Sequence, residues 1–413
     1  MIKISDFHTK KINFAFLIFF ILYLIRLSSG LFNGILRLNS TKVYMHSNWL
    51  VNYRGGFIRR GLGGEIILGI SSLFKISPIT TMTVISAVLW LTLIIWFVIK
   101  FYQLNYPFFI LSLPFFLGET ILLDPSLFLR QDSLILLLFI SMLTILFRTR
   151  NLREPVLFFF LNSLFILGIL IHEAIFFFSF PLLFITYCRK YTTRTVKAFL
   201  FFLPSLTVFI LCFLLPERSS VEKMLQLTPE IERNDVWFMT ITTKQNFIAI
   251  WENFNKPNSI FTLFYLSLTS LLIFFVCINF DKLKIYSSKE IQINKSYLMQ
   301  ILLLQFASIF PLFTCAWDYG RWFFLWITSS FIYFIIAQDH PFDLNFNILK
   351  KLPKYINNPK PLIVFCTAII INCQFCLPFD VNFYSRTPIY LVARTIVKTV
   401  FYAVTFLSFS GFE

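Results

Sequence analysis

Charged residues are scarce in this chain, since Asp, Glu, Lys and Arg together make up only 14% of its 413 residues. Hydrophobic residues make up 57%, and 56 residues are phenylalanine. A soluble domain carries nearer a quarter charged residues and cannot hide so much apolar surface in one core. The composition therefore excludes an ordinary soluble protein and predicts a chain whose main solvent is lipid.

Several catalytic signatures are also missing. The sequence has no GxSxG, Walker, HExxH or GxGxxG pattern and only four histidines, which removes the usual support for ATPases, metalloproteases and nucleotide-dependent oxidoreductases. Among the seven cysteines, Cys373 and Cys376 have CxxC spacing, but neither a second CxxC nor a histidine pair accompanies them. The sequence predicts no metal and no cofactor.

The basic charge has a simpler interpretation than nucleic-acid binding. The formal net charge is +16, but no basic polar segment is long enough for a nucleic-acid module. With a cytoplasmic N-terminus, the predicted inside segments hold 19 of the 36 Lys and Arg and only six of the 20 acidic residues. This asymmetry follows the positive-inside rule and predicts that orientation, with no nucleic-acid partner.

Long apolar runs predict an all-α fold, a polytopic helical membrane bundle of about 11 or 12 spans. We expect one integral membrane domain over residues 1–413, with outside segments at 31–78 and 216–258 and a re-entrant or amphipathic stretch in the first of them. The predicted spans lie near 12–30, 79–99, 107–123, 133–147, 155–171, 174–188, 197–215, 259–279, 297–314, 323–337, 361–377 and 389–410.

The first outside segment contains the most distinctive motif. Five of the chain's 12 glycines lie between Gly55 and Gly64, together with Arg54, Arg59 and Arg60. Glycine lets backbone N–H groups approach a ligand, and arginine offers a planar fork that matches phosphate oxygens. The motif favours a phosphate or diphosphate site at the membrane surface. The alternative is a tight re-entrant turn whose arginines reach lipid headgroups.

Other ionisable residues fall at predicted outside junctions between spans. They are Arg130 and Asp132 before the fourth span, the His172-Glu173 pair between the fifth and sixth, and Asp318 and Arg321 between the ninth and tenth. Such residues are costly at membrane depth unless they are paired or face a wet cavity. An outward-opening cavity explains their common side, although Asp318–Arg321 as a local ion pair and His172-Glu173 as a helix-end contact remain alternatives.

An arginine-rich cavity at lipid level suits an anionic ligand with a hydrophobic tail, such as a sugar linked to polyprenyl diphosphate. Glycosyl transfer from such a donor needs a base for the acceptor hydroxyl and positive charge for the departing diphosphate. The candidate catalytic residues are Asp318, His172 and Glu173. The candidate diphosphate ligands are Arg54, Arg59, Arg60, Arg130 and Arg321, and the secondary candidates are Glu65, Asp132, Tyr53 and Trp322.

The segment from Trp49 to Leu62 and the junction motifs just described resemble those of bacterial O-antigen and capsule repeat-unit polymerases (Wzy-like) and, more distantly, polyprenyl-dependent glycosyltransferases of the GT-C type. The resemblance implies a multi-pass enzyme of the bacterial inner membrane whose active site faces the periplasm. It implies undecaprenyl-diphosphate-linked oligosaccharide, membrane lipid and a chain-length regulator as partners. GT-C enzymes typically carry an acidic residue early in the first outside loop, but residues 31–64 contain none.

Three alternatives remain at this point. A flippase or other transporter of lipid-linked oligosaccharide would line its path with charge at mid-membrane depth, whereas the charges here gather near one end. A single-sugar transferase would use a polyprenyl-phosphate donor with the same residues. In an acyltransferase, His172 and Glu173 would be the pair of residues to consider for catalysis.

Overall fold

The computed structural model describes residues 44–104, 129–148, 153–191, 195–215, 218–236, 295–315 and 319–337, together with Ile248 and Glu252. Within these ranges every regular element is helical and none is a strand. The helices are α2 (Tyr44–Leu50), α3 (Gly61–Phe74), α4 (Pro78–Leu104), α6 (Asp132–Arg148), α7 (Glu154–Ile171), α8 (Ala174–Lys190), α9 (Thr195–Leu214), α10 (Arg218–Leu227), α14 (Lys295–Cys315) and α15 (Tyr319–Ala337), with a short 3-10 helix, η3 (Arg233–Val236).

The helical membrane bundle predicted from the sequence is confirmed. Among the described residues, three helices are long and apolar enough to cross a membrane, within Pro78–Phe97, Glu154–Ile171 and Thr195–Leu214, and four shorter helical stretches are also apolar. Seven predicted spans coincide with α4, α6, α7, α8, α9, α14 and α15. The other five, near 12–30, 107–123, 259–279, 361–377 and 389–410, lie outside the described residues.

Helix α4 shows how local sequence sets an element's start. Ser77 precedes the helix, and its Oγ accepts a hydrogen bond from the Thr80 N–H at 3.1 Å. Pro78 occupies the first helical position, where a missing N–H costs nothing. The 27 residues of α4, Pro78 included, would extend about 40 Å, enough for the hydrocarbon core of a bilayer.

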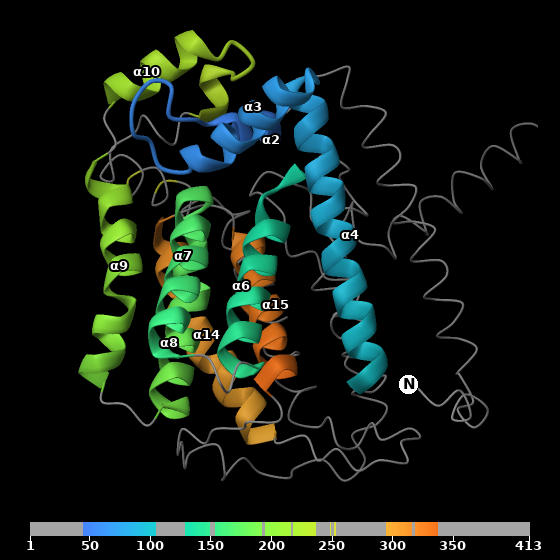
Figure 1. Cartoon of the computed structure of the whole chain (residues 1–413), viewed down its shortest axis with the longest axis vertical. Helices are drawn as coiled ribbons and strands as arrows, with labels where there is room; N and C mark the ends of the chain where they lie inside the picture. Colours follow the sequence, from blue (N-terminus) through green and yellow to red (C-terminus); the bar gives the residue numbers. More distant parts are fainter. Residues whose placement is uncertain are drawn as a thin grey trace, which may run out of the picture.

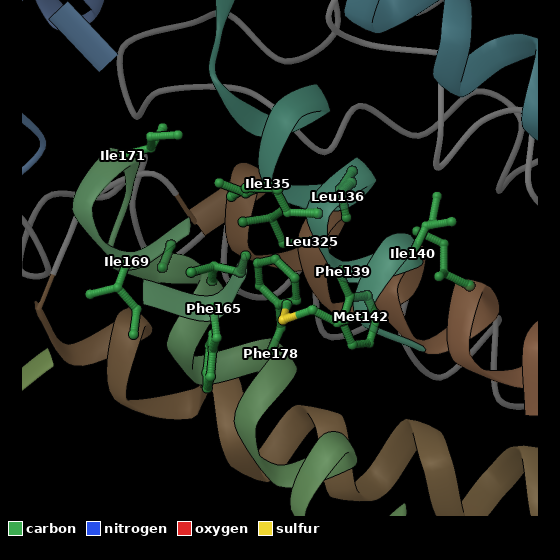
Figure 2. Close-up of a cluster of buried hydrophobic side chains, with 14 of the residues drawn as sticks. Ile135, Leu136, Phe139, Ile140, Met142, Phe165, Ile169, Ile171, Phe178 and Leu325 are labelled. Carbon is green, nitrogen blue, oxygen red and sulfur yellow. The ribbon is translucent and has the colours of Figure 1, made fainter. Parts of the chain in front are cut away.

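The bundle consists of α6, α7, α8, α9, α14 and α15, whose axes run roughly along one direction, with α4 beside them (Figure 1). Phenylalanine provides much of the packing, because Phe139 and Phe165 are fully buried, and Phe139 meets Phe178 edge to face at 5.5 Å. Figure 2 shows these side chains converging with Ile135 and Leu325 from neighbouring helices.

Two polar side chains within the bundle form hydrogen bonds across helices. Asn162 of α7 donates to the Phe201 carbonyl of α9 at 2.9 Å and accepts from Ser205 at 2.7 Å. Gln305 of α14 bonds to the Phe178 carbonyl of α8 and to Ser329 of α15. Such bonds satisfy groups that would be costly in hydrocarbon, and they fix how the helices face one another.

A second layer crosses one end of the bundle. Helices α2, α3 and α10 lie there, drawn in blue and yellow-green at the top of Figure 1. The ends of α7 and α8 that flank residues 172–173 lie at this same end, as do the first turns of α6 and α15. The re-entrant or amphipathic stretch expected in the first outside segment contains two helices, α2 and α3, and the described part of the second outside segment contains α10.

Candidate functional site

The arginine- and glycine-rich loop between α2 and α3 is anchored to α10. The side chain of Asn52 donates to Thr228 Oγ1 at 2.9 Å and to the Leu50 carbonyl at 2.8 Å. Gly55 packs so closely on α10 that a Cβ there would collide with the backbone of Ser220 and Met224. The described parts of the predicted outside segments, residues 44–78 and 218–236, thus make one layer.

Helix α3 packs equally tightly on its own loop. The Gly64 N–H donates to the Val51 carbonyl at 3.1 Å, and a Cβ on Gly64 would overlap that carbonyl group. Glu65, a secondary site candidate, accepts a hydrogen bond from the Tyr53 N–H at 2.8 Å. Backbone atoms lie closest to Gly55 and Gly64, and side chains lie closest to Gly56, Gly61 and Gly63, so the glycines of this motif allow close packing.

Arg60 connects this layer to the bundle. It stands at the N-terminal boundary of α3 with a left-handed backbone, φ 65°, an uncommon conformation for any residue but glycine. Its Nε donates to Glu173 Oε2 at 2.7 Å, and its Nη2 donates to the other carboxylate oxygen. Glu173 lies at the α7–α8 junction, 113 residues away, so a two-pronged ion pair joins the layer of α2, α3 and α10 to the helices of the bundle.

A second ion pair lies within the bundle. Arg321, in the first turn of α15, donates from Nε and Nη2 to Asp132, the first residue of α6, at 2.7–3.0 Å. Asp132 is fully buried, and only 7% of Arg321 is exposed. The Nη2 of Arg321 also lies 2.9 Å from His172 Nε2. The nearest pairing suggested by the sequence, Arg321 with Asp318, involves a residue outside the described ranges.

His172 completes a chain of contacts between the two ion pairs. Its Nδ1 accepts from the Ala174 N–H at 3.2 Å and lies 3.9 Å from a Glu173 oxygen. Both ring nitrogens therefore lie near N–H groups, and a neutral imidazole can accept a hydrogen bond at one of them. Burial and the charges of Arg60 and Arg321 outweigh the opposing charge of Glu173 and hold the pKa of His172 well below 6.5. The imidazole is neutral at neutral pH.

Glu173 is held in the opposite state. Burial alone would raise its pKa, but the charge and hydrogen bonds of Arg60, with a smaller contribution from Arg59, lower the pKa below its usual 4.5. The carboxylate is therefore ionised at neutral pH and is a weak base while Arg60 holds it.

Four helices begin at this cluster. Asp132 opens α6, Glu173 precedes the first residue of α8, Arg321 lies in the first turn of α15, and Arg60 directly precedes α3. A helix N-terminus carries about half a positive charge. The two carboxylates thus occupy favourable helix ends, whereas the two arginines add positive charge to ends that are already positive. The local field favours anions.

The remaining predicted site residues are divided between this cluster and its surroundings. Arg54 is exposed in the loop, and Arg59 is partly buried within electrostatic range of Glu173. Arg130 is buried next to the Asp132 end of α6, and Trp322 is buried with its ring 5.3 Å from the Arg321 guanidinium carbon. The Tyr53 ring stacks on Phe57. The candidate base Asp318 lies outside the described residues.

The sequence did not indicate the partners. Asp132 was only a secondary candidate, although it is the most deeply buried acid of the cluster, and Asn52 and Thr228 were not singled out. The position of Asp132 directly before an apolar run was the available signal. Over the described ranges, no three His, Cys, Asp or Glu side chains are grouped closely enough to hold a metal ion.

Comparison with known proteins gives a partial match. Residues 18–177 match the family model described as "Uncharacterised membrane protein Rv1490", which is less than half of the chain. The matched segment includes Arg60, Asp132, His172 and Glu173 and ends before Arg321. No curated protein and no solved structure matches the chain.

Proposed function

We propose that this protein is a membrane-embedded glycosyltransferase of surface polysaccharide synthesis. Its substrate is a sugar or oligosaccharide linked to polyprenyl diphosphate, and its preferred reaction is the joining of repeat units. The active site lies at the end of the bundle covered by α2, α3 and α10. In a bacterial inner membrane with the N-terminus in the cytoplasm, this end faces the periplasm.

The observation that carries the proposal is the buried cluster of Arg60, Glu173, His172, Arg321 and Asp132. These residues come from four separate parts of the chain and make a continuous set of contacts at one end of the bundle. Buried ion pairs contribute little net stability, because desolvation offsets their attraction. Their presence at one end of a helical membrane bundle, at four helix N-termini, therefore favours a role with an anionic substrate.

The chemistry follows from the charges. The oxygen of an acceptor hydroxyl attacks the anomeric carbon, its proton passes to a carboxylate, and the bond from that carbon to the diphosphate oxygen breaks. The diphosphate leaves with the electron pair and is stabilised by arginine. Glu173 and Asp318 are the candidate bases. His172 is less suited, because both its nitrogens already face N–H donors and its ring lies beside Arg321.

Deleting the gene in its host and separating the surface polysaccharide on a gel tests this proposal. We expect the ladder of long chains to disappear while a single repeat unit remains, with recovery when the wild-type gene is restored. Loss of a side branch from an intact ladder would indicate a single-sugar transferase instead. Loss of all periplasmic lipid-linked repeat units would indicate a flippase, and an unchanged polysaccharide would contradict the proposal.

A further inference from the structure

The two arginine–carboxylate pairs of the cluster differ in accessibility. In the Asp132–Arg321 pair the side chains are 1% and 9% exposed, and Arg321 is also held by His172. In the Arg60–Glu173 pair the arginine side chain is 14% exposed and belongs to the loop layer rather than to a spanning helix. Because Arg60 is the more exposed of the two arginines, a phosphate headgroup that enters the site would reach it first, and Arg60 is the arginine expected to change partner.

The Arg60 contact has the geometry that a phosphate would use. Its Nε and Nη2 bind the two oxygens of one carboxylate side by side. Arginine presents the same pair of N–H groups to two oxygens of a phosphate. A phosphate carries at least as much negative charge as a carboxylate, so the exchange would leave the guanidinium no less well paired.

We propose that Glu173 occupies the place on Arg60 that a phosphate of the substrate takes, so that anion binding releases the Glu173 carboxylate to act as the base. This inference rests on the proposed function for the identity of the reaction, but the partner exchange itself can be measured without turnover. The ligand class is a phosphate or diphosphate, free or at the head of a polyprenyl lipid.

The exchange gives Glu173 two states with different reactivity. While paired, its carboxylate is strongly stabilised and binds protons weakly. Once Arg60 has turned to the phosphate, the carboxylate stays buried with only the more distant charge of Arg59 to offset desolvation, which strengthens it as a base. Proton transfer would then be available only after the leaving group is bound.

A competition measurement tests the exchange directly. The full-length protein is reconstituted in lipid nanodiscs, and the dissociation constants of inorganic pyrophosphate and of undecaprenyl diphosphate are measured. Glu173→Gln removes the competing charge, so we expect both ligands to bind about tenfold more tightly or better. Arg60→Gln should weaken both by a similar factor, and Arg60→Lys, which keeps the charge but loses the fork, should fall between Arg60→Gln and wild type.

The matched control is Glu222→Gln. Glu222 also pairs with an arginine, since the Nη2 of Arg233 donates to both of its carboxylate oxygens, but this pair lies on the exposed surface of the α10–η3 segment. It should leave both dissociation constants unchanged. Undecaprenyl diphosphate binding more tightly than pyrophosphate would identify the lipid-linked ligand, and equal affinities would identify a site for the phosphates alone, both consistent with the exchange.

Unchanged or weaker binding by a folded Glu173→Gln protein would overturn the exchange, as would wild-type affinity in Arg60→Lys and Arg60→Gln. Should Glu173→Gln fail to fold, the two Arg60 variants decide. The proposed function can fail independently of the exchange. If Glu173→Gln binds the anions more tightly but gene deletion leaves the polysaccharide unaltered, the exchange stands and the glycosyltransferase proposal is rejected. If gene deletion removes the ladder but the Glu173 and Arg60 variants bind both ligands like wild type, the glycosyltransferase proposal stands and the exchange is rejected.

Discussion

Replacing Asp132 with alanine is expected to be among the most damaging single substitutions in the bundle. Asp132 is fully buried and accepts three contacts from Arg321 at 2.7–3.0 Å. Its removal leaves a guanidinium charge in a site with little water, and breaking a buried pair in this way costs about 3–5 kcal/mol. The first turn of α6 also loses a favourable charge, worth about 0.3–1 kcal/mol.

The assay is unfolding of the purified protein in mixed micelles of increasing SDS content, followed by tryptophan fluorescence. Asp132→Ala should unfold at a clearly lower SDS fraction than wild type. The double variant Asp132→Ala, Arg321→Met should be more stable than Asp132→Ala alone, because no buried charge is then left behind. Glu222→Ala, which breaks the exposed pair with Arg233, should stay within experimental error of wild type. A double variant whose loss equals the sum of the two single losses would refute the reasoning.

Three further predictions concern packing, pH and topology. Gly64→Ala should lower the melting temperature markedly, because its Cβ would overlap a backbone carbonyl group. Gly69→Ala in the same helix meets nothing within 4 Å and should raise the free energy of unfolding by about 0.5–1 kcal/mol. Equal melting temperatures of the two variants would contradict the close packing. The pKa of Glu173 is depressed in the folded protein, so the stability lost in Glu173→Gln should be constant from pH 8 to pH 6 and shrink only as pH falls below about 4.5; a difference that disappears already at pH 6 would be inconsistent with that shift. In intact cells, a membrane-impermeant maleimide should label Arg54→Cys above the background of the parent protein but label Lys197→Cys only after permeabilisation, and the reverse pattern would invert the proposed orientation.

The sequence was sufficient for the helices because their signal is local. Runs of apolar residues long enough to span a bilayer can be located by composition alone, and seven predicted spans coincide with helices of the structure to within a few residues. The start of α3 was less predictable. It begins at Gly61, among glycines that disfavour helix, because contacts with the loop and with Tyr53 compensate for the poor propensity.

The partners within the cluster could not be predicted, because each contact joins residues far apart in the chain. Arg321 suggested a local pair with Asp318, three positions away, but its described partner, Asp132, lies 189 positions away. Which of the candidate acidic residues pairs with which arginine depends on how the helices pack. The periodicity of a single sequence does not contain that information. What the sequence did contain was the common side on which these residues fall.

The placement of the two arginines argues that the cluster was shaped by more than stability. Helix N-termini favour negative charge, yet Arg60 and Arg321 stand at the starts of α3 and α15. Arg60 also has a backbone conformation that most residues avoid. Local rules are commonly broken where function requires it. Two helix ends and two guanidinium groups, of which Arg60 is partly accessible, are balanced by buried carboxylates and make a site that an incoming phosphate can enter by taking the place of Glu173.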